Sequence, residues 1–283
     1  MPSRAPIERR ARDVAARGAR LRVTEAGDEA GAPLVLLHGF MVSHLEFDDV
    51  IDLFARRFHV LAPDLPGFGE SEKPSPARYA YGVETFAEAV VDLVAAYGLG
   101  RSSVVGHAMG GTVALTLAAH HPELVARLVL VDAICYPRRL GLGARLELLP
   151  VVGAVLFKQL YGRRRFRRYF QEQVFAPDAA VPPALVDRFY AYFNTPAARE
   201  SAYAVLTALL DTRPVVARIA RIRTPALVVW GRDDRVVPAS FALRLAREIP
   251  GARLELLDAG HCPHAELPQE FVAAVSEFLE GKR

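Results

Sequence analysis

The chain has 283 residues, 52% of them hydrophobic, which is enough to bury a large core and excludes a disordered or peptide-like protein. Its formal net charge of +3 does not indicate nucleic-acid binding. Two cysteines exclude a disulfide framework, and no apolar stretch follows the arginine-rich N-terminus as it would in a signal peptide. We therefore expect a cytoplasmic protein.

The first third of the chain predicts strands separated by turns and helices. Residues 1–19 carry arginines among alanines, which is typical of a frayed or weakly helical surface arm. Residues 20–25 predict an edge strand, and residues 34–37 a fully buried strand. The buried strand leads directly into the sequence His-Gly-Phe-Met at 38–41.

The next segments continue this alternation. Residues 45–57 predict a helix, 58–63 a buried strand and 83–97 a second helix. Between them, residues 64–71 form a loop rich in glycine and proline, for which we expect a structural role.

A sharp strand-to-helix turn is predicted at residues 103–120. Residues 103–105 indicate a buried strand, and residues 112–120 favour a helix. Glycines at 106, 110 and 111 permit a tight turn and close packing of the helix on the strand. Residues 127–132 predict the next buried strand, so the half-chain alternates strands and helices. This order predicts a parallel sheet covered on both faces, with an active site at the carboxyl ends of its strands.

Five motifs carry a resemblance to a known family, and they span nearly the whole chain. In these motifs and in their order, the chain resembles the α/β-hydrolase superfamily, of the capped esterase, lipase and carbon–carbon-bond hydrolase type. The resemblance implies that family's fold. The motifs are LVLLHGF at 34–40, DLPGFGES at 64–71, VGHAMGG at 105–111, WGRDDRVVP at 230–238 and GHCPHAELP at 260–268.

The central position of the family's G-x-S-x-G elbow, which carries the nucleophilic serine, is Ala108 here. A methyl group cannot attack a carbonyl carbon. The backbone N–H groups of Phe40 and Met109 are the predicted donors of an oxyanion hole, from the His-Gly loop and from the residue after the nucleophile position.

The other members of a catalytic triad are placed by motif in the order nucleophile, acid, histidine. The pattern G-x-x-D after the predicted strand 227–230 points to Asp234 as the acid, with Asp233 as runner-up and Asp132 as a weaker alternative. His261 resembles the catalytic histidine, whereas His264 is expected to stabilise its loop. An imidazole takes the proton of the nucleophile, and a buried carboxylate fixes its tautomer.

The alternation stops between residues 134 and 213, where this family places its cap. We therefore predict a helical cap at 134–213 inserted into a core of 20–133 and 214–283. The cap has 12 Arg and Lys against 6 Asp and Glu, and the rest of the chain has 23 against 26. The basic run 163–168 favours a membrane surface, an acyl carrier or an anionic ester, the alternative being a solvated basic helix.

No metal or nucleotide signature is found, so no cofactor is expected. Neither Cys135 nor Cys262 stands at the elbow, and neither replaces the missing serine. The aromatic and aliphatic cap predicts a small-molecule ester or acyl substrate with a largely apolar group. Carbon–carbon-bond hydrolases of the family often have Gly-His-Trp where this chain has Gly-His-Cys at 260–262, a difference that argues against that subclass.

Three hypotheses follow for the function. The first is a serine hydrolase of carboxylesterase type whose nucleophile is replaced by alanine, as in an inactivated variant. The second is a natural enzyme that uses His261 and Asp234 as base or acid without a covalent intermediate. The third is a non-catalytic protein that keeps the pocket as a receptor.

Overall fold

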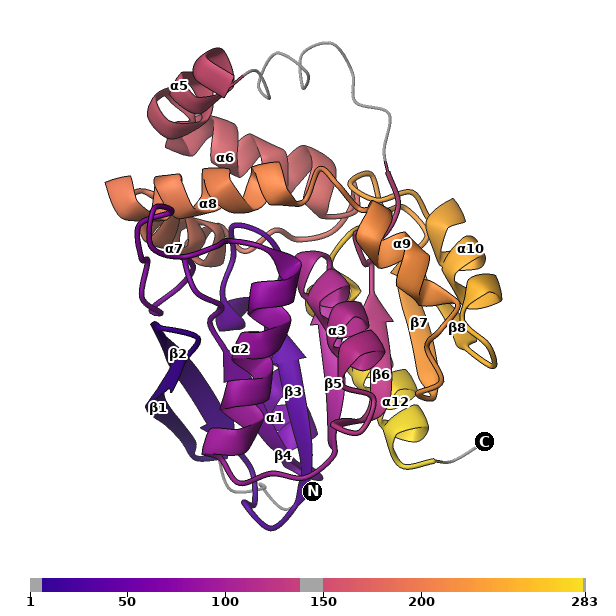
Figure 1. The fold of residues 1–283 in the computed structure, drawn as a ribbon. Helices are drawn as coiled ribbons and strands as arrows, with labels where there is room; N and C mark the ends of the chain where they lie inside the picture. Colours follow the sequence, from indigo (N-terminus) through magenta and orange to yellow (C-terminus); the bar gives the residue numbers. More distant parts are fainter. Residues whose placement is uncertain (1–6, 138–149, 282–283) are drawn as a thin grey trace.

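The computed structural model describes residues 7–137 and 150–281, and a single eight-stranded sheet forms its centre (Figure 1). The order in the sheet is β1-β2-β4-β3-β5-β6-β7-β8, and all pairs from β4 to β8 are parallel. The α/β-hydrolase fold is thereby confirmed. The strands are β1 Arg9–Ala16, β2 Ala19–Ala26, β3 Ala32–Leu37, β4 Phe58–Pro63, β5 Ser102–His107, β6 Val125–Val131, β7 Ala226–Gly231 and β8 Arg253–Leu257.

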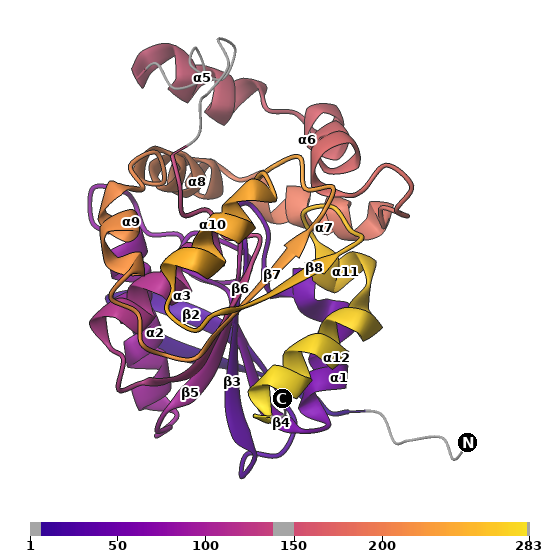
Figure 2. The same cartoon turned by 90° about the vertical axis from the view of Figure 1, so that its right-hand side faces the viewer.

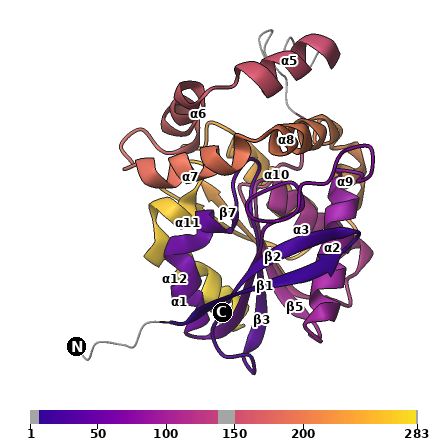
Figure 3. The same cartoon turned by 90° about the vertical axis from the view of Figure 1, so that its left-hand side faces the viewer.

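The start of the chain differs from the expected arm. Residues 9–16 form strand β1, which pairs antiparallel with β2 through a two-residue turn at Arg17 and Gly18 (Figure 3). Both turn residues have positive φ, of 46° and 78°, as a tight hairpin requires. The prediction of a frayed or helical arm is thus wrong for β1, and β2 is not the edge strand. Residues 1–6 of the predicted arm lie outside the described residues.

Helices cover both faces of the sheet, because successive apolar residues of a strand point to opposite sides (Figure 2). Leu34 and Leu36 of β3 pack on one helical layer, while Val35 and Leu37 pack on the other. The first layer contains η1 His44–Phe47, α1 Asp48–Ala55, α11 Pro263–Glu266 and α12 Pro268–Leu279. The second contains α2 Val83–Ala96, α3 Met109–His120, α9 Arg213–Ile219 and α10 Ser240–Glu248.

The segment between β6 and α9 contributes helices that lie over the carboxyl ends of the parallel strands (Figure 1). Phe166 stacks on Phe170 and Phe193 at centroid distances of 5.0 and 5.7 Å, so these helices share an aromatic core. Residues 138–149 of the predicted cap lie outside the described residues. The cap helices are α5 Pro150–Leu160, α6 Arg163–Tyr169, the π-helical turn η2 Phe170–Val174, α7 Pro183–Phe193 and α8 Pro196–Ala208.

Within the described part of the chain, none of the helices is long and apolar enough to cross a lipid bilayer.

One buried arginine joins two cap helices. Arg199 of α8 is 9% exposed, and its guanidinium donates to the carbonyl oxygens of Phe157, Lys158 and Tyr161 near the end of α5. It also donates to the Asn194 side chain at 2.7 Å. Since the last carbonyls of a helix lack intrahelical donors, Arg199 satisfies groups that would otherwise be left without partners.

We expect Arg199→Met to destabilise the cap by about 2–4 kcal/mol, because several charge-assisted hydrogen bonds are lost while the apolar stem is retained. Limited proteolysis should then cleave the cap faster than the sheet, and the thermal midpoint should fall. Arg164→Met, at an exposed position of α6, is the control and should leave both unchanged. Equal behaviour of the two variants would contradict this role for Arg199.

Candidate active site

The turn at Ala108 has the geometry predicted for a nucleophile elbow. Ala108 joins β5 to α3 with φ 49° and ψ −109°, and its side chain is buried. A Cβ at residue 106 would come within 2.3 Å of the Gly110 carbonyl oxygen, and one at residue 110 within 2.0 Å of the Leu37 carbonyl oxygen. The two glycines are therefore required for the contact of α3 with the sheet.

Backbone strain gathers around this turn. Four non-glycine residues of the described chain have positive φ, and three of them, Met41, Ala108 and Asp132, follow the parallel strands β3, β5 and β6. Such conformations cost on the order of 1–3 kcal/mol each and persist where the surrounding structure enforces them. In an elbow this strained conformation directs the nucleophilic side chain towards the substrate, a purpose that the methyl group of alanine does not serve.

The predicted acid and histidine are in contact. His261 Nδ1 lies 2.8 Å from Asp234 Oδ2, and Asp234 Oδ1 accepts hydrogen bonds from the amides of Val236 and Val237. Burial opposes ionisation of Asp234, but the charge and hydrogen bond of His261 outweigh it, so the pKa of this carboxyl is lowered. Asp233, the alternative acid, is exposed on the same turn, and the structure does not bring it to the histidine.

The loop that carries His261 is also attached to the cap. The His261 amide donates to the Val174 carbonyl oxygen at 2.7 Å, and Glu266 accepts hydrogen bonds from the amides of Gly260 and Ala176. With the Nδ1 proton directed at Asp234, the basic nitrogen of His261 is Nε2.

The predicted oxyanion donors come from two loops at the same end of the sheet. Met109 is the first residue of α3, where a helix leaves amides without intrahelical acceptors. Phe40 follows Gly39, and the amide of Gly39 is held by Glu46 Oε1 at 2.9 Å. A Cβ at residue 39 would lie 3.5 Å from the Cβ of Ala108, so this loop borders the elbow. The catalytic roles of both amides remain predictions.

A buried ion pair connects these parts, and the sequence did not reveal it. His107 Nδ1 lies 3.1 Å from both oxygens of Glu46, and Nε2 lies 2.8 Å from the His261 carbonyl oxygen. Both ring nitrogens face acceptors, so both carry protons and the ring is an imidazolium. No signal in the sequence singled out Glu46, because the helical segment 45–57 carries other acidic residues such as Asp48 and Asp49.

The pKa values of this pair support the assignment. Burial opposes the charge of each group, but the Glu46 carboxylate raises the pKa of His107, and His107 lowers the pKa of Glu46. The pair thus joins the oxyanion loop through Gly39, the elbow through His107 and the histidine loop through His261.

His264 stabilises its loop through packing. Its ring is fully buried between Phe47, Phe271 and His107, and neither ring nitrogen has a hydrogen-bond partner among the described residues. Burial lowers its pKa to about 3. Burial also raises the pKa of the Cys262 thiol, as expected for an apolar neighbour and not for a nucleophile.

Two groups of ligand-type side chains arise in the described residues. His107, Cys262 and His264 have atoms within 4.8 Å of one another, but both nitrogens of His107 already donate hydrogen bonds. Asp132, Asp234 and His261 are equally close, and Asp234 already accepts three hydrogen bonds. The second group is a hydrogen-bonded network, whereas His264 in the first group makes ring contacts and no hydrogen bond among the described residues.

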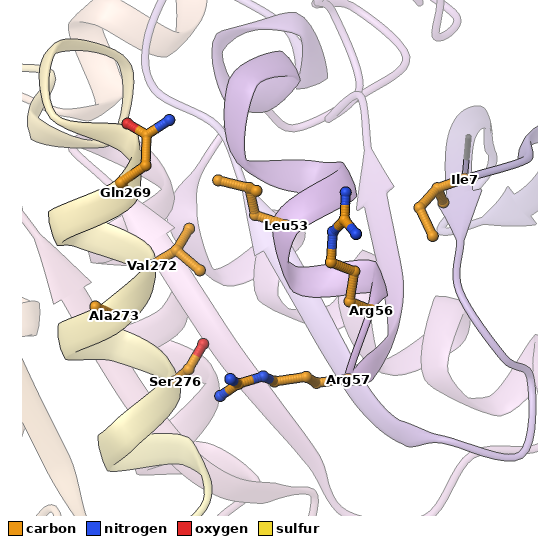
Figure 4. A pocket seen from close by; sticks show the side chains of 8 residues that line it. All are labelled: Ile7, Leu53, Arg56, Arg57, Gln269, Val272, Ala273 and Ser276. Atoms are coloured by element: carbon orange, nitrogen blue, oxygen red, sulfur yellow. The ribbon is translucent and has the colours of Figure 1, made fainter. Parts of the chain in front are cut away.

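A cavity of about 320 Å³ lies between the core and the cap, and Phe40 and Met41 of the loop that borders the elbow line it. It contains the predicted oxyanion residue Phe40, and its lining is aromatic and aliphatic apart from tyrosine and threonine hydroxyls. The lining residues are Phe40, Met41, Ile134, Tyr136, Pro137, Phe157, Tyr161, Tyr169, Leu206, Leu209, Leu210 and Thr212. A larger hollow of about 870 Å³ between α1 and α12 contains none of the site residues (Figure 4).

The basic run of the cap has partners within the cap. Arg167 forms an ion pair with Asp187, and Arg168 lies 3.7 Å from Glu172. Arg163 stands over the ring of Tyr190 at 5.5 Å. These contacts are those of a folded helical surface, and contact with a membrane or an acyl carrier remains a prediction.

The family model described as alpha/beta hydrolase fold matches residues 32–268. The chain therefore belongs to the α/β-hydrolase family.

Individual relatives agree with this assignment. A 2-hydroxymuconate semialdehyde hydrolase of Pseudomonas is 30% identical over 282 residues, covering 95% of this chain and 93% of the relative. A magnesium-chelatase 30 kDa subunit of Rhodobacter capsulatus is 28% identical, and the match covers 92% of this chain and 90% of that subunit. The structure of a serine hydrolase involved in carbazole degradation superposes with a TM-score of 0.81 at 27% identity. The match covers 97% of this chain and 100% of that hydrolase. These likenesses support a hydrolase function.

The Glu46→Gln variant should be destabilised by about 3 kcal/mol near neutral pH, because it leaves the His107 imidazolium buried without its counter-charge. The pKa of Glu46 is lowered on folding, so its contribution is present above about pH 4.3 and is lost as the pH falls. The pKa of His107 is raised, so its contribution is complete below about pH 6.5 and is lost as the pH rises further.

The stability difference between parent and variant should therefore be largest between about pH 5 and 6.5 and shrink on both sides, as measured by thermal unfolding across pH. Glu277→Gln, at an exposed position of α12, is the control. A difference that does not vary with pH would show that Glu46 and His107 are not a charged pair.

Proposed function

We propose that this site accommodates an ester or related acyl compound with a largely apolar group, and that it hydrolyses such a compound when serine occupies position 108. One observation carries the proposal: the strained elbow and a complete acid–histidine pair are joined by the hydrogen bond from His107 to the His261 carbonyl oxygen. The loop that borders the elbow contributes Phe40 to an apolar cavity. With alanine at 108, the chain holds this ligand without forming an acyl-enzyme.

Each group has a defined part in the proposed reaction. A hydroxyl on residue 108 attacks the carbonyl carbon, and His261 Nε2 takes its proton and later gives it to the leaving alcohol. Asp234 holds the imidazole tautomer and stabilises the imidazolium. The amides of Phe40 and Met109 stabilise the oxyanion. Water then repeats the sequence to release the acid.

An ester is preferred over the substrate of the hydroxymuconate semialdehyde hydrolases because of the cavity. None of its lining residues is Lys, Arg or His, so the described lining offers no counter-charge for an anionic substrate. The sequence Gly-His-Cys at 260–262 supports the same choice.

A second candidate is a non-covalent reaction in which His261 acts as general base or acid. It is favoured by the coexistence of an intact His261–Asp234 pair with Ala108 in the same chain. A receptor without catalytic activity is the third candidate. It would bind a ligand without converting it, both in the chain with Ala108 and in the Ala108→Ser variant.

The Ala108→Ser variant should gain hydrolysis of short and medium alkyl esters by several orders of magnitude. The backbone conformation already fits an elbow residue, and loss of a triad nucleophile typically costs on the order of a million-fold in turnover. We would measure p-nitrophenyl ester hydrolysis and labelling by a fluorophosphonate, which should mark only the serine variant.

Ala108→Ser combined with His261→Ala is the matched control and should lose the gained activity. A folded serine variant that remains inert towards these esters, while the parent converts or binds another ligand, would exclude the serine-hydrolase proposal in favour of the other two.

Substrate charge gives an independent test of the cavity. In the Ala108→Ser protein, the p-nitrophenyl ester of hexanoate should have at least a tenfold higher kcat/KM than the mono-p-nitrophenyl ester of adipate, which has the same chain length. Desolvating an unpaired carboxylate in an apolar cavity is costly. A preference for the adipate ester would indicate that cap arginines reach the substrate.

A further inference from the structure

The side chain of Asp132 is fully buried at the end of β6, and only one of its two oxygens has a geometric partner. Oδ1 accepts a hydrogen bond from the Gly231 amide at 3.0 Å, and Oδ2 has none within the described structure. The Asp132 amide itself donates to the Val229 carbonyl oxygen. Both ends of the residue are thus tied to β7, whose following turn carries Asp234.

The neighbour that Oδ2 requires is a second carboxyl group. Asp132, Asp234 and His261 offer atoms that lie within 4.8 Å of one another. Two ionised carboxylates have only acceptors and repel each other, so they cannot form a hydrogen bond. One proton on the pair turns one carboxyl into a donor and removes the repulsion, as in other carboxyl dyads.

The surroundings decide which group keeps the proton. The Asp234 carboxylate accepts hydrogen bonds from two backbone amides and from the His261 ring. All three hydrogen bonds favour the ionised form of Asp234. Among the described residues, the Asp132 carboxyl accepts a hydrogen bond from the Gly231 amide alone. We propose that Asp132 is protonated at neutral pH and donates a hydrogen bond to Asp234, so that it positions the catalytic acid as an anion facing His261.

The charged groups around Asp132 act in the same direction. Burial raises the pKa of Asp132 well above its usual range, and the charge of Asp234 and its hydrogen bond add to this effect. The hydrogen bond from the Gly231 amide lowers the pKa of Asp132, whereas the negative charge of Glu266 raises it further. His261 makes its hydrogen bond to Asp234, and one of its ring nitrogens also lies within 4.8 Å of an Asp132 oxygen.

Asp132→Asn in the chain as it stands tests the protonation directly. Asparagine imitates a neutral carboxyl with a donor and an acceptor. Native electrophoresis at neutral pH should therefore show no change in net charge. Asp49→Asn, at an exposed position of α1, is the control and should change the mobility by one charge. The infrared band of a protonated carboxyl should disappear in Asp132→Asn alone. A one-charge change in Asp132→Asn would overturn the proposal.

Thermal unfolding across pH provides a second readout. In the parent, Asp132 keeps its proton when folded but loses it above about pH 3.9 when unfolded, so the parent loses stability as the pH rises. Asparagine does not titrate. The midpoint of Asp132→Asn minus that of the parent should therefore increase from about pH 4 to 7. A constant or decreasing difference would contradict a protonated Asp132.

The positioning role rests on the proposed function and is tested in the Ala108→Ser background. There, Asp132→Asn should keep kcat within a few-fold, whereas Asp132→Ala should lower kcat about ten- to a hundred-fold with little change in KM. Equal losses in both variants would overturn the positioning role. If the serine background is itself inactive, the proposed function fails, and the electrophoretic and thermal results still decide the state of Asp132.

Discussion

The buried ion pair of Glu46 and His107 is the interaction on which the site depends. It joins three loops that are far apart in the sequence: the oxyanion loop at Gly39, the elbow and the loop of His261. Opposite charges in a water-excluded interior hold such loops firmly, and each hydrogen bond has a defined direction. The pair therefore holds the relative positions of these three loops.

The parallel sheet sets the place of this interaction. Strands β3, β5, β6 and β7 end at the same edge, and the loops that follow them carry the strained or charged residues of the site. The cap contributes the remaining wall of the cavity and holds the histidine loop through the Val174 carbonyl oxygen. The cap therefore contacts the core at the loop of His261, next to the acid–histidine pair.

At Ala108 the local conformation and the residue type disagree. The glycines at 106 and 110 and the left-handed backbone at 108 belong to a turn that exposes a reactive side chain, yet the residue there is a methyl group. The buried groups of the surrounding network favour their charged forms, since the pKa of Asp234 is lowered and that of His107 is raised. This mismatch makes residue 108 the natural point for experiment.

The sequence by itself determined the strand–helix alternation and the elbow, because apolar periodicity and glycine spacing act locally. The acid and the histidine were assigned through the resemblance of their motifs to those of the family. The motif favoured Asp234 over Asp233, and the tertiary structure buries the Asp234 carboxyl against His261 and exposes Asp233. It also placed β1 on the sheet, since the arginine-rich segment 9–16 forms a strand only when β2 offers its edge. The ion pair of Glu46 and His107 joins residues that are 61 positions apart and become neighbours only in the folded core. No local sequence pattern predicts such a contact.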